Sequence, residues 1–283
     1  MTKTNTKWHD DVIEYIPDGD KFDDYIHREV SPGVDEFEMF DYAREANAHV
    51  LIEGPTGCGK THSVYAYAAT HGIPVYSVPC NGAADPAALF GTYVPDEEAG
   101  EGFVWRDGPV TKLARHGGIL LLNEINFLPA KVAVTLFELL DKRGSLSILD
   151  HDEFFHASED LLVIADYNDG YIGTKRLTEA LKNRFSVFMT YGYLTEIEKE
   201  LVHSKTLIKI AEKLREGYKS GEIRTPVATN KLPDFEKIAV AVSFDAAIDN
   251  FVAGFDPDEK EAVRKVISSM RSELEEDYGV EYE

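Results

Sequence analysis

The sequence has no long apolar run, few cysteines and far fewer basic than acidic residues. None of its 283 residues lies in an uninterrupted apolar run of about 18, so no membrane-spanning helix is expected. The first eleven residues are polar and lack the apolar core of a signal peptide. Two cysteines, Cys58 and Cys80, cannot build a disulfide framework, which fits a reducing compartment. These features predict a cytoplasmic protein.

The charge balance is strongly acidic. There are 29 basic and 51 acidic side chains, and the formal net charge is −22. This field repels phosphate backbones and argues against a nucleic-acid partner, although a local basic patch in the pore of an oligomer would override it. Part of the acidic excess lies at the end of the chain, where residues 276–283 are expected to form a solvated acidic tail.

Short apolar segments alternate with helical patterns between residues 35 and 191. Several of the segments are continuously apolar, as strands buried on both faces must be, and the alternation favours a parallel α/β sheet. A helical domain is expected at 192–275, and residues 1–34 form an N-terminal extension. The expected strands are residues 49–53, 74–78, 118–122, 161–165 and 186–190.

Two other expectations concern local elements. Residues 145–149 and 153–155 flank the polar turn Asp150–Asp152, which predicts a hairpin inserted at the edge of the sheet. This tip contains His151 and further acidic residues, and a solvated turn is favoured there over a metal site. Three helices are expected after the sheet, over residues 196–215, 235–251 and 258–276, with Pro226 and Pro233 punctuating them.

The segment from Gly54 to Thr61 matches the phosphate-loop pattern G-x-x-x-x-G-K-[ST] between an apolar strand and a helix. Its backbone N–H groups and the helix N-terminus favour phosphate oxygens. Lys60 is expected to reach the β- and γ-phosphates, and the Thr61 hydroxyl to bind Mg²⁺. Cys58 contributes its backbone, and an incidental side chain is favoured over a redox role. The predicted ATP-binding residues here are Gly54, Pro55, Thr56, Gly57, Cys58, Gly59, Lys60, Thr61 and His62.

A second motif follows the apolar strand at 118–122. Asn123 stands where an Asp that helps to hold Mg²⁺ is usual, so it is assigned to the metal site without bringing a charge. Glu124 suits a general base that polarises the attacking water. The phosphate loop alone does not separate ATP from GTP.

In combination, these motifs resemble AAA+ ATPases of the dynein-related and MoxR type, including CbbQ/NorQ-like activators and chelatase ATPase subunits. The resemblance implies an α/β core with a parallel sheet and helices on both faces, followed by a small α-helical lid. It also implies a homo-oligomeric ring, usually a hexamer, that remodels a protein client such as a von Willebrand factor A domain protein. The segments that carry it are residues 85–91, 103–110, 117–126 and 139–143.

The same resemblance implies further site residues. Asn168 matches the sensor 1 residue that positions the attacking water, although an Asn before Asp169-Gly170 also suits a turn. Arg184 matches the arginine finger that reaches the γ-phosphate of the neighbouring subunit, with Arg176 as a competing candidate.

The lid departs from the family pattern. Asn230 occupies the sensor 2 position. The family usually has Ser-Thr-Arg there, whereas this chain has Ala228-Thr229-Asn230. Lys231 or Arg224 are alternatives for the role of the sensor 2 arginine. Tyr25 to His27 lie where such ATPases often contact adenine. Residues 92–105 suit either a hairpin that faces the pore or an inert loop.

The expected function is therefore a MoxR-like chaperone that couples ATP hydrolysis to the activation of a protein partner. Two alternatives remain. Asn123 and Asn230 favour a weakly hydrolysing, ATP-dependent scaffold, and a nucleic-acid motor is disfavoured by the acidity.

Overall fold

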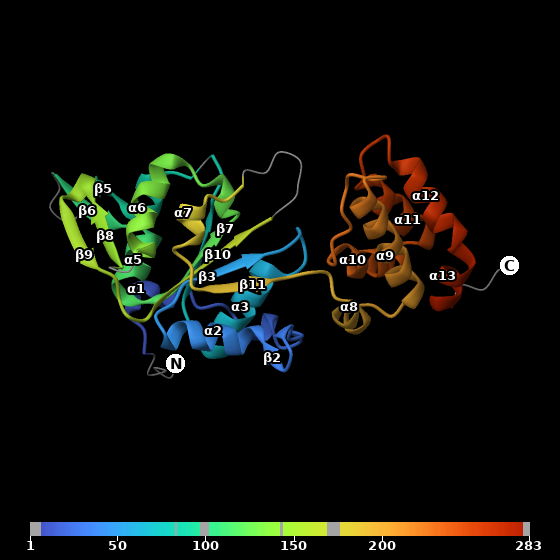
Figure 1. The fold of residues 1–283 in the computed structure, drawn as a ribbon, viewed down its shortest axis with the longest axis horizontal. Coiled ribbons are helices and arrows are strands. Elements are labelled where there is room, and N and C mark those ends of the chain that lie inside the picture. The colour runs from blue at the N-terminus through green and yellow to red at the C-terminus, as the bar shows by residue number, and fades with distance from the viewer. Residues whose placement is uncertain (1–6, 83, 97–101, 142–143, 169–175, 280–283) are drawn as a thin grey trace. The chain divides into compact units, whose positions relative to one another are not determined.

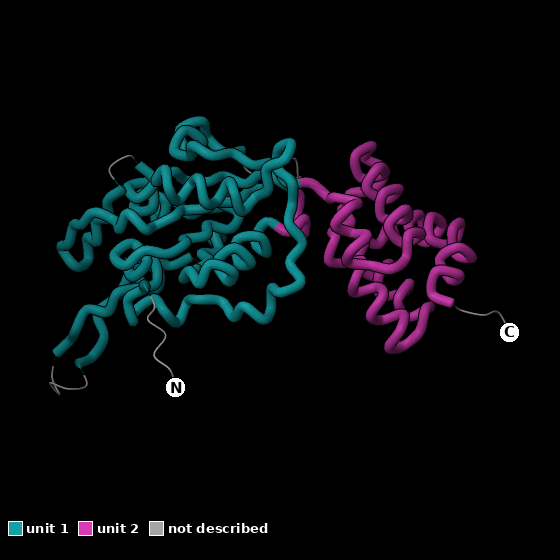
Figure 2. Tube along the Cα trace, turned by 90° about the horizontal axis from the view of Figure 1, so that it is seen from below, with its two compact units in different colours: residues 1–54, 60–191 teal, residues 55–59, 192–283 magenta. Residues whose placement is uncertain are grey.

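The computed structural model describes residues 7–82, 84–96, 102–141, 144–168 and 176–279. Contacts divide the chain into two compact units (Figure 2): unit 1 is Met1–Gly54 with Lys60–Tyr191, and unit 2 is Pro55–Gly59 with Gly192–Glu283. Several positions named above lie outside the described residues, namely residues 1–6, 97–101, 142–143, 169–170 and 280–283.

A five-stranded parallel sheet forms the centre of unit 1 (Figure 1), in the order β11-β3-β10-β7-β4. The side chains of β7 and β10 are almost all buried, which explains why these strands are apolar without alternation. The prediction of a parallel α/β sheet is confirmed. The strands are β3 (Val50–Glu53), β4 (Val75–Pro79), β7 (Gly118–Asn123), β10 (Leu161–Tyr167) and β11 (Val187–Thr190).

The sheet order places the connecting helices. The chain leaves β3 through α3 to reach the edge strand β4, then returns through α5 to β7. Connections between parallel strands are right-handed, and the chain crosses the sheet in one direction from β3 to β4 and in the opposite direction from β4 to β7. The helices α3 and α5 therefore lie on opposite faces of the sheet. The helices of unit 1 are α1 (Asp10–Ile13), α2 (Glu36–Glu45), α3 (Lys60–His71), α4 (Pro86–Phe90), α5 (Pro109–His116), α6 (Ala130–Leu140) and α7 (Glu179–Lys182), with 3-10 turns η1 (Gly19–Lys21), η2 (Ile125–Phe127) and η3 (Leu149–His151).

Three antiparallel hairpins accompany the sheet in the described part of the chain. The predicted hairpin is present as β8 and β9, but among the described residues these two strands pair only with each other and do not extend the edge of the parallel sheet. The reason is packing: Leu146 and Ile148 are buried, and β8 lies against α6. The hairpins are β1 (Glu29–Ser31) with β2 (Val34–Asp35), β5 (Gly91–Pro95) with β6 (Phe103–Asp107), and β8 (Ser145–Ile148) with β9 (Glu153–His156).

Unit 2 is helical, and each of its three expected helices is in fact two. Ser204 and Ser243 end the preceding segments because their hydroxyls cap new helices, accepting hydrogen bonds from the N–H groups of Leu207 and Ala246. Pro233 does not interrupt a helix but lies in the first turn of α10, where its missing N–H costs nothing. The helices are α8 (Thr195–Leu201), α9 (Lys205–Ser220), α10 (Lys231–Ala241), α11 (Phe244–Ala253), α12 (Lys260–Ser269) and α13 (Arg271–Asp277).

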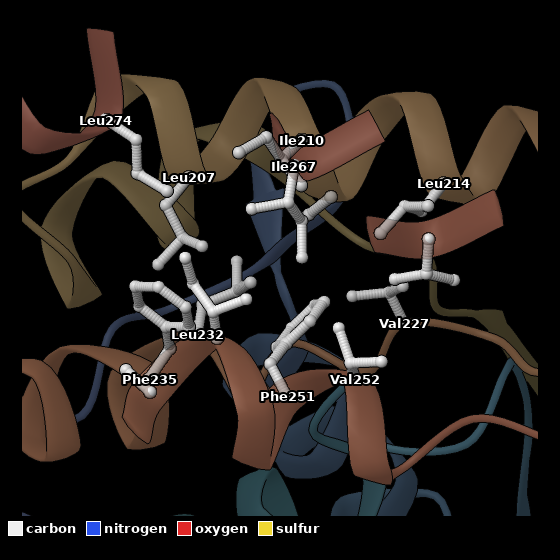
Figure 3. Close-up of a cluster of buried hydrophobic side chains, with 14 of the residues drawn as sticks. Leu207, Ile210, Leu214, Val227, Leu232, Phe235, Phe251, Val252, Ile267 and Leu274 are labelled. Carbon is white, nitrogen blue, oxygen red and sulfur yellow. The ribbon is translucent and has the colours of Figure 1, made fainter. Parts of the chain in front are cut away.

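The helices of unit 2 enclose a core of their own (Figure 3). Their apolar side chains converge between α9 on one side and α10 and α11 on the other. Leu232, Ile210 and Leu274 are fully buried there. Because unit 2 has a core of its own, its residues make most of their contacts with one another, and the chain divides into two units. The labelled members are Leu207, Ile210, Leu214, Val227, Leu232, Phe235, Phe251, Val252, Ile267 and Leu274.

Hydrogen bonds and packing hold both ends of the described chain in place. Within the expected N-terminal extension, the indole of Trp8 donates to the carbonyl of Gly72 at 2.8 Å, and Val12 is buried. At the other end, the expected solvated tail begins inside α13, where Asp277 accepts a 2.7 Å hydrogen bond from the Ser204 hydroxyl. Among the described residues, no helix has the length and apolar character needed to cross a membrane.

Candidate functional site

The phosphate loop joins β3 to α3, and Lys60 is the first residue of that helix. The Lys60 side chain is buried, and its ammonium donates to the carbonyl of Gly54 at 2.8 Å and to Oδ1 of Asn168 at 2.6 Å. Gly57 and Gly59 have φ values of 70° and 98°, which an L side chain rarely adopts. The glycines of the motif therefore serve backbone curvature.

Within unit 2, residues 55–59 lie beside the segment that carries Asn230. A Cβ atom at Gly57 would meet Cβ of Ala228 at 2.4 Å and Oδ1 of Asn230 at 3.3 Å. The hydroxyl of Tyr193 donates to the carbonyl of Thr56 at 2.8 Å. Asn230 is thus close to Gly57 within unit 2, and its side chain is neutral.

The predicted metal ligands lie next to each other in unit 1. The Thr61 hydroxyl donates to Oδ1 of Asn123 at 3.4 Å, and Nδ2 of Asn123 donates to the Ser77 hydroxyl at 2.5 Å. These bonds orient the amide so that its oxygen faces Thr61. Two neutral oxygens at this spacing form a donor set that suits a hard cation such as Mg²⁺, although neither carries a charge.

The carboxyl ends of β7 and β10 bring Glu124 and Asn168 together. Nδ2 of Asn168 donates to Oε1 of Glu124 at 3.3 Å, while its Oδ1 accepts from Lys60. Lys60, Asn168 and Glu124 therefore form one hydrogen-bonded chain. Neighbouring parallel strands end at the same edge of a sheet, so residues 44 positions apart meet here.

Asp166 is a buried acid at this site to which the sequence analysis assigned no role. Its Oδ1 accepts the backbone N–H of Glu124 at 3.0 Å. Burial raises the pKa of Asp166, an effect opposed by the Glu124 N–H and by Lys60 and increased by the Glu124 carboxylate. Burial, with Asp166 and Glu124 nearby, also raises the pKa of the Cys80 thiol to about 12. The available signal was an acidic residue directly after the apolar segment at 161–165.

Arg184 is not part of this cluster. Its Nε donates to Oδ1 of Asp141 at 2.9 Å, one Nη donates to the carbonyl of Ala180, and the guanidinium lies 4.8 Å from the Phe137 ring centroid. None of these partners is a predicted nucleotide-site residue. The competing candidate, Arg176, is exposed.

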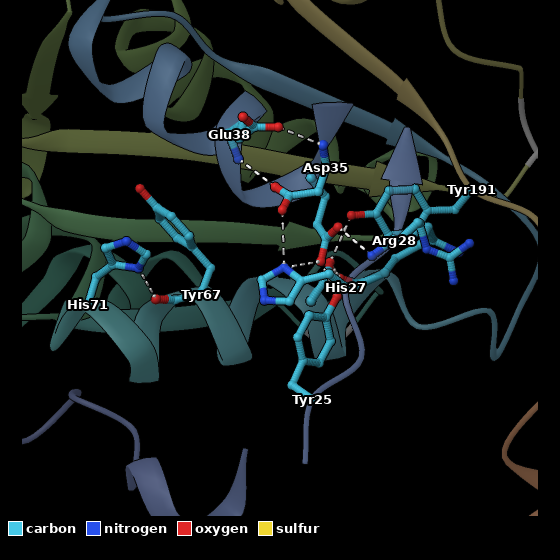
Figure 4. A network of polar contacts seen from close by, with 11 residues as sticks. Tyr25, His27, Arg28, Asp35, Glu38, Tyr67, His71 and Tyr191 are labelled. Atoms are coloured by element: carbon cyan, nitrogen blue, oxygen red, sulfur yellow. Dashed lines mark hydrogen bonds and ion pairs between the residues drawn. The ribbon is translucent and has the colours of Figure 1, made fainter. Parts of the chain in front are cut away.

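His62 follows the phosphate loop and contacts aromatic residues of the N-terminal segment. Its ring centroid lies 5.3 Å from that of Phe22 and 5.4 Å from that of Tyr25. Figure 4 shows Tyr25 in a polar network: its hydroxyl donates at 2.6 Å to the fully buried carboxylate of Glu36, which also accepts the Arg28 N–H at 2.7 Å. Hydrogen bonds from Tyr25 and Arg28 to Glu36 therefore hold the segment suggested for adenine contact beside His62.

Two other groups of side chains in the described part of the chain approach the spacing of a metal site. His9 and His116 flank Asp11, but their rings are stacked with an interplanar angle of 6°, so their in-plane lone pairs do not converge on one ion. In the second group, His27 and Asp35 lie beside Glu36, whose oxygens already accept the hydrogen bonds in Figure 4. Both groups are explained by packing and hydrogen bonding.

Comparison with known proteins identifies the family of the chain. Residues 49–185 match the family model described as AAA domain (dynein-related subfamily). The chain is 32% identical to an uncharacterized protein of Staphylococcus haemolyticus over 76% of this chain and 87% of that protein. It is 34% identical to NorQ of Paracoccus denitrificans, over 70% of this chain and 76% of NorQ. It is also 35% identical to CbbQ of Hydrogenophilus thermoluteolus, over 59% and 62%.

The fold and the site thus define a P-loop nucleotide-binding ATPase with an α/β core. More specifically, the chain belongs to the AAA+ ATPases of the dynein-related subfamily, and within them it is of the NorQ/CbbQ, MoxR type.

Proposed function

We propose that this protein hydrolyses ATP and uses the energy to remodel or activate a protein partner. The observation that carries the proposal is the hydrogen-bonded chain from Lys60 through Asn168 to Glu124. It unites a phosphate-binding ammonium, a polar residue and a carboxylate at one edge of the sheet. A carboxylate held in this way is placed to accept a proton from a water that attacks the terminal phosphate.

Each residue has a distinct task in this proposal. The loop N–H groups and Lys60 bind the phosphates, and Asn168 orients the attacking water together with Glu124. The Thr61 and Asn123 oxygens would hold Mg²⁺, which when bound neutralises charge on the phosphates. The Lys60 ammonium donates to the Gly54 carbonyl and to Oδ1 of Asn168, which fixes its position beside Asn168 and Glu124.

The proposal includes a ring, expected to be hexameric, in which Arg184 reaches the active site of the next subunit. The position of Arg184 away from the Lys60 cluster of its own chain supports a role in a neighbouring subunit. The resemblance to CbbQ/NorQ-like activators supports a protein client, such as a von Willebrand factor A domain protein.

Two substitutions test the ATPase function. Lys60→Ala should abolish ATP binding, because it removes the cation that contacts the phosphates. Glu124→Gln should retain ATP binding and lower turnover by about 10²- to 10⁴-fold, the usual contribution of general acid–base catalysis. Unchanged turnover of Glu124→Gln would remove Glu124 as the base, and ATP binding by Lys60→Ala would refute the site assignment.

The same two variants, Glu124→Gln and Lys60→Ala, test whether the protein binds a protein client. The Glu124→Gln protein, loaded with ATP, should retain a client in a pull-down, and mass spectrometry would identify it. Lys60→Ala is the matched control, since it cannot be loaded. Equal recovery of every protein by both variants would contradict an ATP-dependent client.

Asn123 favours a second candidate, a scaffold that binds ATP and hydrolyses it slowly. Its amide brings no charge to the metal site, and its oxygen faces Thr61. If the protein is such a scaffold, steady-state turnover should be low and Asn123→Asp should raise it by about tenfold or more, as a charged metal ligand improves Mg²⁺ binding. Fast turnover in the unmodified protein would exclude the scaffold.

A further inference from the structure

The backbone at Glu124 has a conformation that side chains rarely adopt. Its φ and ψ are 55° and 51°, in the left-handed region, between the end of β7 and the 3-10 turn η2. This conformation is unfavourable for a residue other than glycine, asparagine or aspartate, so surrounding contacts must maintain it. Such strain is commonly retained where a side chain has to be aimed.

Asp166 supplies one of those contacts. The last paired residues of β10 and β7 are Ala165 and Leu122, so the regular ladder between these strands stops two residues before Glu124. Beyond that point the Asp166 carboxylate accepts the Glu124 N–H at 3.0 Å. The side chain thus continues the hydrogen bonding between the strands after their backbones diverge.

β10 therefore holds Glu124 at two points. Asp166 accepts from its backbone, and Asn168, two residues further on, donates to its carboxylate at 3.3 Å. Asp166 is only 3% exposed, and burial of a carboxylate is unfavourable unless strong hydrogen bonds satisfy it. The net pKa of Asp166 is raised, because burial and the Glu124 carboxylate outweigh the opposing effects of the Glu124 N–H and Lys60. A side chain without an acceptor would avoid the burial of a charge at position 166, which indicates that the acceptor oxygen serves the site.

We propose that Asp166 is a positioning residue for Glu124: it fixes the left-handed turn that aims the Glu124 carboxylate at Asn168 and the attacking water. This inference rests on the proposed function, in which Glu124 is the general base. Asp166 itself acts through Glu124 and is assigned no contact with the nucleotide.

Steady-state ATP hydrolysis by Asp166→Ala and Asp166→Asn tests the inference. Asp166→Ala removes the acceptor and should lower kcat by about 10- to 100-fold with little change in KM, since misplacement of a reacting group by about 1 Å has an effect of this size. Asp166→Asn keeps an oxygen for the Glu124 N–H, so its kcat should stay within about fivefold of the unmodified protein. The control is Cys80→Ala, which changes a buried neighbour with no hydrogen bond to Glu124 and should leave kcat unchanged.

A double-variant cycle separates positioning from general stability. In the Glu124→Gln background there is no base left to aim, so Asp166→Ala should lower the residual kcat by less than about twofold. A further fall as large as in the unmodified background would overturn the proposal, as would an unchanged kcat in Asp166→Ala. So would an Asp166→Asn protein as slow as Asp166→Ala, because charge and not the acceptor would then matter. If Asp166→Ala fails to fold, the comparison of Asp166→Asn with the unmodified protein decides.

A failure of the positioning role can be distinguished from a failure of the proposed function. That function fails if the unmodified protein does not hydrolyse ATP or if Glu124→Gln does not impair hydrolysis. The positioning role fails when both of those controls behave as expected and the Asp166 variants do not.

Discussion

Removal of Arg215 should destabilise unit 2 more than any surface substitution. The guanidinium binds the carboxylate of Glu198 through two hydrogen bonds, at 2.9 and 2.6 Å, and its Nε donates to the carbonyl of Val227 at 2.9 Å. It also lies 4.0 Å from the Tyr193 ring centroid. The side chains of Arg215 and Glu198 are 10% and 0% exposed, so water cannot replace these contacts.

The magnitude follows from the charge that would remain. In Arg215→Leu, the buried carboxylate of Glu198 keeps only the Thr229 hydroxyl, at 2.6 Å, as a partner among the described hydrogen bonds. Breaking one partner of a buried ion pair costs about 3–5 kcal/mol. Because domains are stable by about 5–15 kcal/mol, unit 2 would lose a large part of its free energy of unfolding.

Urea unfolding followed by circular dichroism, with hydrogen exchange of α9 as the local readout, measures the effect. With an m-value of about 1–2 kcal/mol/M, the midpoint of the transition that exposes α9 should fall by about 1.5 M or more. The double variant Glu198→Leu/Arg215→Leu should recover at least half of the loss, because no buried charge remains. Arg264→Ala, which breaks a pair with Asp249 at the surface, is the control and should not shift the midpoint. A midpoint for Arg215→Leu equal to that of the control would refute the reasoning.

Three further outcomes are expected. Partial burial raises the pKa of Asp277, but hydrogen bonds from the Thr206 N–H and the Ser204 hydroxyl outweigh this effect, and the net pKa is lowered. The ionised Asp277 side chain therefore stabilises the folded state above about pH 4, and this stabilisation is lost as pH falls through the folded-state pKa. The stability difference between Asp277→Asn and the unmodified protein, measured in urea, should accordingly be largest at neutral pH and shrink in acid, and a difference independent of pH would contradict this. With a pKa of about 12, buried Cys80 should resist iodoacetamide at pH 8 until the chain is unfolded, as peptide mass spectrometry would detect. Arg184→Ala should retain ATP binding and lower kcat by about 10³-fold or more if it is the arginine finger, whereas an equal loss in Arg176→Ala alone would favour that competitor.

Much of the fold could be predicted because its signals are local. A strand buried on both faces has to be apolar along its length, so the segments at 118–122 and 161–165 were placed to within two residues of β7 and β10. The phosphate loop was equally visible, because glycine at fixed positions meets a backbone requirement that neighbouring residues impose. Helix boundaries in unit 2 were less predictable. Ser204 and Ser243 resemble ordinary polar residues until their hydroxyls are seen to cap helices.

The sequence by itself therefore determined the nucleotide loop, the five strands of the parallel sheet, and the choice of Lys60 and Glu124 as candidates, since each depends on residues close together in the chain. Only the tertiary structure decided that Lys60, Asn168 and Glu124 form one hydrogen-bonded chain, and that Asp166 holds the backbone of Glu124. It also decided that Arg215 and Glu198 form a buried pair. The physical reason is that these contacts join distant segments, and their geometry depends on strand register and burial that no local pattern encodes.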